Sequence, residues 1–200
     1  MGLPNHSIRF FDNQFKRQVR EADFALNPFE RLALPFVGGR LLDLGCGLGN
    51  LSIEAARRGC SVVAIDASDT AVGRIQDVAR RDSLSIQALA ADLTGFRIDQ
   101  DFDAIVCIGL LMFMSRSDAH NLLGEIQSRV VPGGLAIINV LIEGTTYLGM
   151  FDPANYCLFR RNELAERFDG WSILESRYQT FPAPEGTHKV FSTIIAEKPS

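Results

Sequence analysis

The sequence predicts an α/β fold in which helices cover both faces of a mostly parallel sheet. Three observations support this prediction. An apolar strand breaks into a glycine-rich turn and enters a helix within residues 41–59. Two further apolar segments, residues 61–66 and 86–92, each end in an aspartate. Residues 172–197 form two alternating segments joined by a proline-rich turn, which predicts an antiparallel hairpin attached to the sheet.

The composition argues against several classes of protein. The 200 residues contain 46% hydrophobic and 22% charged residues with a formal net charge of -4, values typical of one globular domain. Because there is no dense basic run, we expect neither nucleic acid nor a membrane as a partner. The longest apolar run, residues 104–114, is too short to span a bilayer, and no signal-type segment opens the chain. The four cysteines lack the spacing of a metal site or a disulfide framework, so we expect no metal and a cytoplasmic location.

Residues 1–39 are expected to form a helical N-terminal extension before the core over residues 40–200. Apolar residues recur at every fourth position from Phe11 to Val19, which predicts an amphipathic helix. The stretch Asn27-Pro28-Phe29-Glu30 predicts the capping box of a second short helix. The first helix either packs on the edge of the sheet or forms a lid over a ligand, and the pattern leaves both interpretations open.

The stretch Leu41–Asn50 predicts a ligand-binding turn after the first strand of the core. Gly45, Gly47 and Gly49 alternate with other residues in it, so side chains do not keep a ligand away from the main chain. Asn50 is expected to cap the helix that follows. An ordinary tight turn between strand and helix is the alternative, but it does not need three alternating glycines.

The spacing of these glycines argues against an ordinary dinucleotide site. Dinucleotide-binding turns follow the pattern G-x-G-x-x-G, and its third glycine would fall where the sequence has Asn50. Asp43 lies two residues before Gly45, where its carboxylate would repel a pyrophosphate and attract a cation. The turn therefore predicts a nucleotide ligand that carries positive charge, such as a sulfonium.

Aspartates at the ends of the next two strands extend the same pattern. Asp66 lies 66 − 45 = 21 residues beyond Gly45, the spacing of an acid that accepts hydrogen bonds from ribose hydroxyls. A helix-capping role is the alternative for this residue. Asp92 is placed to accept a hydrogen bond from an exocyclic adenine amine, while Leu93 packs on the base. Open α/β sheets bind ligands where their strands end, so these carboxylates and Asp43 predict one site.

The second half of the chain continues the alternation of strands and helices. The expected elements are a strand over residues 102–109, an apolar loop over residues 110–114, a helix capped by Asp118, a turn at Pro132-Gly133-Gly134 and a strand over residues 135–142. Residues 144–161 then show no clear period, and loops of this length are usually functional or mobile. A helix through Leu164 and Phe168 precedes the closing hairpin, with strands expected over residues 172–180 and 189–197.

Taken together, these motifs resemble those of class I S-adenosylmethionine-dependent methyltransferases. The resemblance rests on Leu-Asp-Leu-Gly-Cys-Gly-Leu-Gly, the acids Asp66 and Asp92, Phe-Asp-Ala-Ile-Val, Pro-Gly-Gly and the closing hairpin. It implies a three-layer sandwich around a seven-stranded sheet of order 3-2-1-4-5-7-6, with the last strand antiparallel. Residues 1–200 would then be a single methyltransferase domain with a Rossmann-like core. Within the class, residues 108–114 and 158–164 resemble the tellurite-resistance methyltransferases.

This resemblance and the motifs imply S-adenosyl-L-methionine as cofactor. The cofactor-binding residues would be Asp43, Gly45, Cys46, Gly47, Asn50, Asp66, Ala67, Asp92, Leu93 and Ile108. Methyl transfer from a sulfonium is an in-line displacement, for which a protein mainly supplies proximity, alignment and desolvation. The candidates to orient or deprotonate the acceptor are His188, Tyr147, Arg160 and Tyr156, each of which could instead be structural.

The expected acceptor is a small molecule, namely a thiol, a chalcogen oxyanion or a similar group. Methyltransferases that act on amino groups of DNA bases resemble one another in an Asn/Asp-Pro-Pro-aromatic tetrapeptide where this chain has residues 108–111. A non-catalytic S-adenosylmethionine-binding protein stays open as an alternative. A nicotinamide-dependent oxidoreductase is disfavoured by Asn50 and by the lack of a Tyr-x-x-x-Lys motif.

Overall fold

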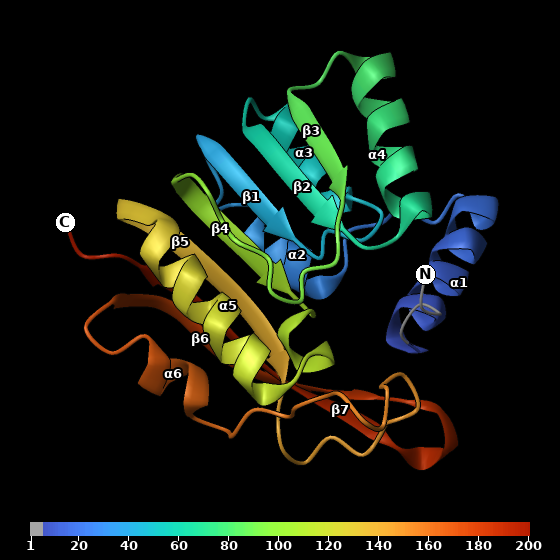
Figure 1. The fold of residues 1–200 in the computed structure, drawn as a ribbon, viewed down its shortest axis with the longest axis vertical. Helices are drawn as coiled ribbons and strands as arrows, with labels where there is room; N and C mark the ends of the chain where they lie inside the picture. The colour runs from blue at the N-terminus through green and yellow to red at the C-terminus, as the bar shows by residue number, and fades with distance from the viewer. Residues whose placement is uncertain (1–5) are drawn as a thin grey trace.

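The computed structural model describes residues 6–200 and places a seven-stranded sheet at the centre of the molecule (Figure 1). The strands are β1 (Arg40–Leu44), β2 (Ser61–Asp66), β3 (Ile86–Ala90), β4 (Phe102–Ile108), β5 (Val130–Leu141), β6 (Ser172–Pro182) and β7 (His188–Glu197). Their order is β3-β2-β1-β4-β5-β7-β6. The pairs among β1 to β5 are parallel, whereas β7 is antiparallel to both β5 and β6. The predicted strand order and closing hairpin are confirmed.

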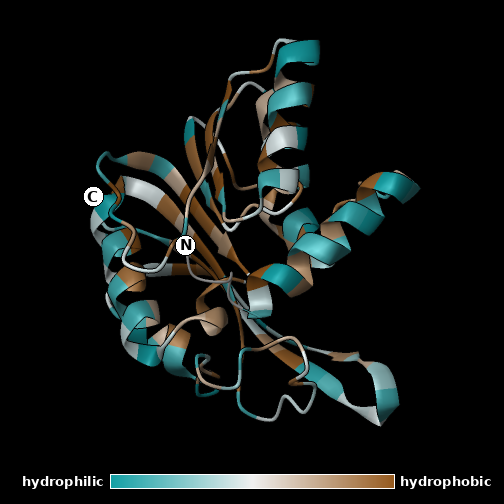
Figure 2. Cartoon of the chain, turned by 45° about the vertical axis from the view of Figure 1, so that its right-hand side comes forward, coloured by the Kyte–Doolittle hydropathy of each residue, from teal (hydrophilic) through white to brown (hydrophobic). Residues whose placement is uncertain are grey.

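Helices cover both faces of this sheet. The helices are α1 (His6–Glu21), α2 (Pro28–Ala33), α3 (Asn50–Arg57), α4 (Asp69–Asp82), α5 (Arg116–Arg129) and α6 (Glu163–Arg167), with 3-10 turns η1 (Leu111–Phe113) and η2 (Pro184–Gly186). Successive strand residues point to opposite faces, so Leu41 packs with α2, α3 and α4 while Leu42 packs with α5 and α6. The strands are mostly apolar and the exposed sides of the helices are mostly polar (Figure 2). In the described range no helix is long and apolar enough to cross a membrane.

Short polar contacts fix where several helices begin. The predicted capping box is present, since Asn27 Oδ1 accepts from the Glu30 N–H at 3.0 Å and Glu30 Oε2 accepts from the Asn27 N–H at 2.7 Å. Ser68 caps α4 through its side chain. The expectation for α5 is wrong by three residues, because the cap is Ser115 and Asp118 lies in the first turn. The Asp118 N–H donates to the Ser115 side chain.

The predicted cap of α3 is also wrong. The N-cap is Gly49, with φ of 71°, and no side chain caps this helix. A β-carbon at Gly49 would lie 2.4 Å from Ile75, so glycine is required both by the backbone and by the neighbour on α4. Asn50 is therefore already helical, and its Nδ2 donates instead to the Ala25 carbonyl at 3.4 Å.

The Pro-Gly-Gly segment differs from the expected turn. β5 begins at Val130 and continues through the segment, with a register shift against β4. Phe102 pairs with Val130 and Ala104 pairs with Leu135, so β5 uses five residues where β4 uses two. The extra residues form an irregularity in the ladder at the end of the sheet where β4 and β5 begin.

Candidate functional site

A cavity of about 770 Å³ opens where the parallel strands end. Its walls come from α1, α2, the glycine turn, the ends of β2 and β4, η1 and β7. Every residue predicted to bind the cofactor lines it, namely Asp43, Gly45, Cys46, Gly47, Asn50, Asp66, Ala67, Asp92, Leu93 and Ile108. Of the four acceptor candidates, Tyr147 also lines the cavity, whereas His188, Arg160 and Tyr156 are not among the lining residues.

The glycine turn is held against the end of β2 by backbone hydrogen bonds. The N–H groups of Gly45 and Cys46 both donate to the Ile65 carbonyl, at 2.9 and 3.1 Å. The Gly47 N–H donates to Asp66 Oδ2 at 2.8 Å. Gly47 has φ of 52°, and a β-carbon there would lie 3.2 Å from the ring of Phe15 on α1. A side chain at this position would therefore strain the backbone and enter the space between the turn and α1.

Buried carboxylates give this end of the cavity an acidic character. Asp43 is 4% exposed and accepts a hydrogen bond from Ser52 Oγ at 2.6 Å. Burial, with a smaller contribution from the neighbouring Glu30 and Asp66, raises the pKa of Asp43 to about 7 against the opposing effect of the Ser52 hydrogen bond. Burial also raises the pKa of Asp66 and of Glu30, although backbone hydrogen bonds oppose the shift in both. A cationic ligand would offset the cost of these charges, so the residues present fit a sulfonium with an ammonium group.

The remaining predicted cofactor residues are placed for hydrogen bonding and packing. Asp92 is exposed and its Oδ1 accepts from the Thr94 N–H at 2.9 Å, while Leu93 beside it is buried. Asn50 Oδ1 is buried and has no hydrogen-bond partner among residues 6–200. A buried acceptor without a partner is costly, so a donor on a bound ligand is the natural partner for this atom.

An aromatic row joins α1 to the irregular segment of residues 143–162. Phe11 meets the ring of Phe113 on η1 edge-on at 5.0 Å, and Phe113 lies 5.0 Å from Phe151. Phe151 in turn stacks on Tyr156 at 4.7 Å. Phe11 and Phe113 line the cavity, so residues far apart in the chain form one part of its wall, and ring contacts extend this row to Phe151 and Tyr156.

A polar contact anchors α1 at the other end of the cavity. Ser68 Oγ donates to Asp12 Oδ1 at 2.7 Å, and Lys16 pairs with the same carboxylate at 2.6 Å. Ser68 also caps α4, so the start of α4 holds α1 above the end of β2.

The period of β7 explains why His188 lies outside the cavity lining. Side chains alternate along a strand, so Lys189 and Phe191 reach the cavity wall while His188 and Val190 face the other side. His188 Nδ1 lies 3.3 Å from Thr146 Oγ1. Sequence reasoning missed Lys189, although the alternation of this strand was available as a signal.

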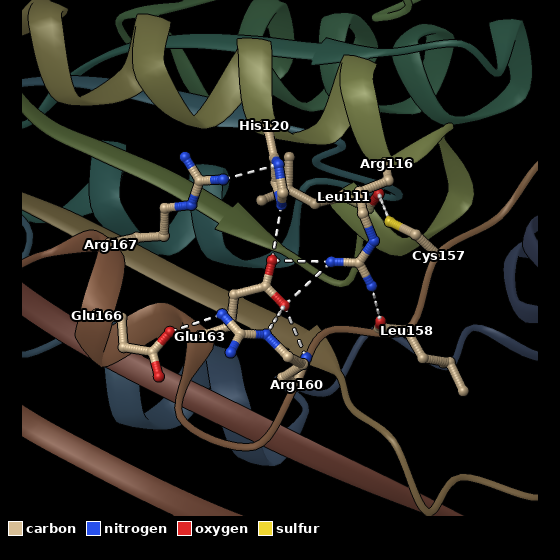
Figure 3. A network of polar contacts seen from close by, with 9 residues as sticks. All are labelled: Leu111, Arg116, His120, Cys157, Leu158, Arg160, Glu163, Glu166 and Arg167. Carbon is tan, nitrogen blue, oxygen red and sulfur yellow. Dashed lines mark hydrogen bonds and ion pairs between the residues drawn. The ribbon is translucent and has the colours of Figure 1, made fainter.

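Arg160 takes part in an ion-pair network (Figure 3), and Arg116, His120, Glu163 and Glu166 of this network do not line the cavity. Its Nη2 lies 2.7 Å from Glu166 Oε2, and its backbone N–H donates to Glu163 Oε2 at 2.8 Å. Glu163 is 2% exposed and also pairs with Arg116 and with His120 on α5, at 2.9 and 2.7 Å. This network connects α5, α6 and the irregular segment. Arg160 therefore makes structural contacts, whereas the sequence suggested it as a residue that orients the acceptor.

Asn139 on β5 is a second lining residue that sequence reasoning missed. It is fully buried and donates from Nδ2 to Thr193 Oγ1 at 2.8 Å. Its Oδ1 has no hydrogen-bond partner in the part of the chain that the structure describes. An asparagine inside an apolar strand segment was the available signal, since a polar residue there requires a partner.

Comparisons with known proteins agree with this fold and turn. Residues 41–134 match a family model described as a methyltransferase domain. The chain is 26% identical over 165 residues to the probable S-adenosyl-L-methionine-dependent methyltransferase TehB of Haemophilus influenzae, covering 80% of this chain and 57% of that protein. It is also 26% identical over 166 residues to hemagglutinin 1 of Eikenella corrodens, covering 80% of this chain and 55% of the relative. The chain thus spans somewhat over half the length of these relatives.

Solved structures share the fold. The crystal structure of TehB from Haemophilus influenzae matches with a TM-score of 0.76 at 20% identity, over 90% of this chain and 65% of that chain. The 1,6-didemethyltoxoflavin-N1-methyltransferase of Burkholderia thailandensis, solved with 1,6-didemethyltoxoflavin and S-adenosylhomocysteine, matches with a TM-score of 0.68 at 20% identity, over 100% and 92% of the two chains. The domain match over residues 41–134 and the shared fold make the chain similar to class I S-adenosylmethionine-dependent methyltransferases. Within this class the chain resembles TehB.

Proposed function

We propose that this protein transfers a methyl group from S-adenosyl-L-methionine to a small-molecule acceptor by in-line displacement. The observation that carries the proposal is that one continuous cavity joins the glycine turn and its carboxylates to an apolar space beyond them. When bound, the cofactor supplies a methyl group already activated by a sulfonium. The protein then needs to hold two reactants in line and exclude water, which agrees with a cavity lining in which residues 6–200 place no Ser/His/Asp triad.

The proposed cofactor contacts follow the order of the strands. Asp43 and the glycine turn would hold the amino-acid part, where a carboxylate meets an ammonium group. Asp66 would accept hydrogen bonds from the ribose hydroxyls. Asp92 would accept a hydrogen bond from the adenine amine, and Leu93 would pack on the base. Cys46, Asn50, Ala67 and Ile108 complete the proposed set by lining the cavity between these groups.

For the acceptor, we propose thiols, chalcogen oxyanions and similar polarizable groups as the first classes to examine. Tyr147 is the proposed acceptor-orienting residue, because it lines the cavity. His188 and Arg160 are not proposed for this role, since they contact Thr146 and the Glu163 network respectively. The probable methyltransferase activity in the name of TehB and the small-molecule substrate of the toxoflavin enzyme support a small acceptor.

We also propose that residues 1–39 act as a lid on a core of residues 40–200 within one domain. Of the extension, residues 6–39 are described, and Phe11 and Phe15 on α1 line the cavity. Because these rings would separate the reactants from solvent, the extension would contribute to desolvation.

Two measurements test the proposed function. Calorimetry should show binding of S-adenosylmethionine and S-adenosylhomocysteine and no comparable binding of NAD. A screen of thiols, phenols, amines, selenite and tellurite should then show acceptor-dependent formation of S-adenosylhomocysteine. Preferential NAD binding would indicate an oxidoreductase. Cofactor binding without turnover of any acceptor class would indicate a non-catalytic binding protein.

A further inference from the structure

The cavity wall changes character from one end to the other. Asp43 and Asp66 lie at the end formed by β1 and β2, and the strand order places β5 and β7 on the other side of β4. The wall on that side includes Met112, Leu141 and Met150, which belong to one apolar cluster. The acidic end suits the cofactor, so the apolar end is the space left for an acceptor.

One cation projects into this apolar end. Lys189 lines the cavity from β7 and is half-buried, with its Nζ 4.9 Å from the centre of the Tyr147 ring. Within residues 6–200 no carboxylate pairs with this ammonium, and burial alone lowers the pKa of Lys189. The other cation of the lining, Arg17, is exposed on α1. A half-buried ammonium without a counter-ion is costly, and a bound anion would relieve that cost.

Asn139 provides a second polar group without a full set of hydrogen-bond partners on the β5 and β7 side of the cavity. Its amide is fully buried, and Thr193 satisfies only the nitrogen. The lining residues of β5 and β7 thus include the polar groups of Lys189 and Asn139 together with the apolar side chains of Leu141 and Phe191. A ligand that suits the wall would therefore combine apolar surface with a localised polar or charged group.

We propose that the acceptor is an organic anion with an apolar body, bound with its negative group against Lys189. This inference rests on the proposed function and narrows its substrate class. A selenite or tellurite ion is small and hydrated on all sides, so it would pair with the ammonium but leave the apolar wall uncovered. An apolar molecule that bears one negative charge would pair with the ammonium and also cover the apolar wall.

The negative charge can belong to the nucleophile or to a separate group. In either case a lone pair of the nucleophilic atom forms the bond to the methyl carbon, while the carbon–sulfur bond breaks and its electron pair stays on sulfur. A thiolate loses its charge in this step. A thiol that carries a separate carboxylate keeps the carboxylate charge, and its thiol proton passes to solvent.

The first test measures binding without turnover. Phenylacetate and neutral 2-phenylethanol are titrated into the complex with S-adenosylhomocysteine. The wild-type protein should bind phenylacetate about tenfold or more tightly than the alcohol, as expected for a charge-assisted contact. Lys189→Met should abolish this preference without weakening the alcohol, and Lys189→Arg should retain it. Arg177→Gln, which removes an exposed charge of β6, is the matched control and should behave as wild type.

The second test separates the two sources of charge. Benzenethiol at alkaline pH carries the negative charge on the nucleophilic sulfur, whereas a mercaptoalkanoic acid carries it on a separate carboxylate. A neutral alkanethiol is the reference compound for both of these anionic thiols. At least one anionic thiol should exceed the neutral thiol and selenite in formation of S-adenosylhomocysteine, with a KM raised by Lys189→Met.

Equal binding of the two phenyl probes, or no effect of Lys189→Met, would overturn the inference. So would methylation restricted to selenite and tellurite. Failure of the proposed function is distinguishable, because it would show either as absence of S-adenosylhomocysteine binding before any acceptor probe is added, or as no turnover of any acceptor class while the two phenyl probes still bind with the expected preference.

Discussion

At the scale of single residues, Asp66 has two roles in the site. Its carboxylate accepts from the N–H groups of Gly47 and Ser68, at 2.8 and 2.9 Å, and it lines the cavity. It therefore fixes the glycine turn and presents its remaining lone pairs to a ligand.

Asp66→Ala should weaken S-adenosylmethionine binding by about 1.5–3 kcal/mol, as expected for lost hydrogen bonds to a charged acceptor. Calorimetry measures the affinity, and circular dichroism establishes that the variant is folded. Asp69→Ala, which removes an exposed carboxylate from the first turn of α4, is the matched control. Unchanged affinity in a folded Asp66→Ala variant would refute the ribose assignment.

Asp43 predicts a pH dependence of the ligand-free protein. Its pKa rises from the ordinary 3.8 to about 7 in the folded protein, so the folded state holds this proton more tightly than the unfolded state. The stabilisation is complete below pH 3.8 and is lost as the pH rises towards 7. Thermal unfolding at several pH values should show this loss, and Asp43→Asn should remove that component of it.

Ligand binding should reverse this proton uptake. A cation beside Asp43 favours its carboxylate, so S-adenosylmethionine binding slightly below the pKa of about 7 should release protons. Calorimetry in two buffers of different ionisation enthalpy measures the release. Equal release by wild type and Asp43→Asn would show that another group titrates.

At the scale of elements, the Glu163 network holds α6 and residues 157–162 against α5. Burial opposes ionisation of Glu163, but hydrogen bonds from the Arg160 N–H, His120 and Arg116 outweigh it and lower its pKa. The stabilisation is therefore present above the ordinary pKa of 4.5 and is lost as the pH falls through the lowered value.

Glu163→Gln should destabilise the protein by on the order of 2–3 kcal/mol, because it leaves the Arg116 guanidinium without its buried partner. Denaturant unfolding at neutral pH measures this change. Glu175→Gln removes a surface partner of Arg177 and should have little effect. A similar stability of the two variants would mean that the buried network contributes no more than a surface pair.

The sequence patterns predicted which helices and strands form better than they predicted which contacts those elements make. The glycine spacing and the strand-end aspartates identified the residues that line one end of the cavity. The pattern from Phe11 to Val19 predicted a helix, but its position over the glycine turn depends on contacts with Ser68 and Phe113. His188 was selected by residue type, whereas the alternation of β7 brings its neighbour Lys189 to the cavity. Residue type alone does not show which face of a strand a side chain occupies.

At the scale of the whole molecule, two segments distant in sequence cover the cavity. We expect α1 and residues 147–156 to become ordered together when both reactants are present, because the aromatic row joins them. Hydrogen exchange should show protection in both segments with S-adenosylhomocysteine and phenylacetate, compared with the ligand-free protein. Helix α6, which does not line the cavity, serves as the internal reference.

Protection confined to residues 43–92 in every state would contradict the lid. Protection of α1 alone would show that the helix responds to the cofactor without the irregular segment. In that case the acceptor end of the cavity would be open to solvent during transfer.

The sharing of one cavity by both reactants has a consequence for turnover. Phe11 and Phe15 of α1 line the same cavity as Asp66 at one end and Tyr147 at the other. Both products would therefore depart past the same helix. Displacement of α1, rather than methyl transfer, would then be the rate-limiting step of the catalytic cycle. Such a cycle slows in viscous solvent and shows a rapid first turnover followed by a slower steady rate.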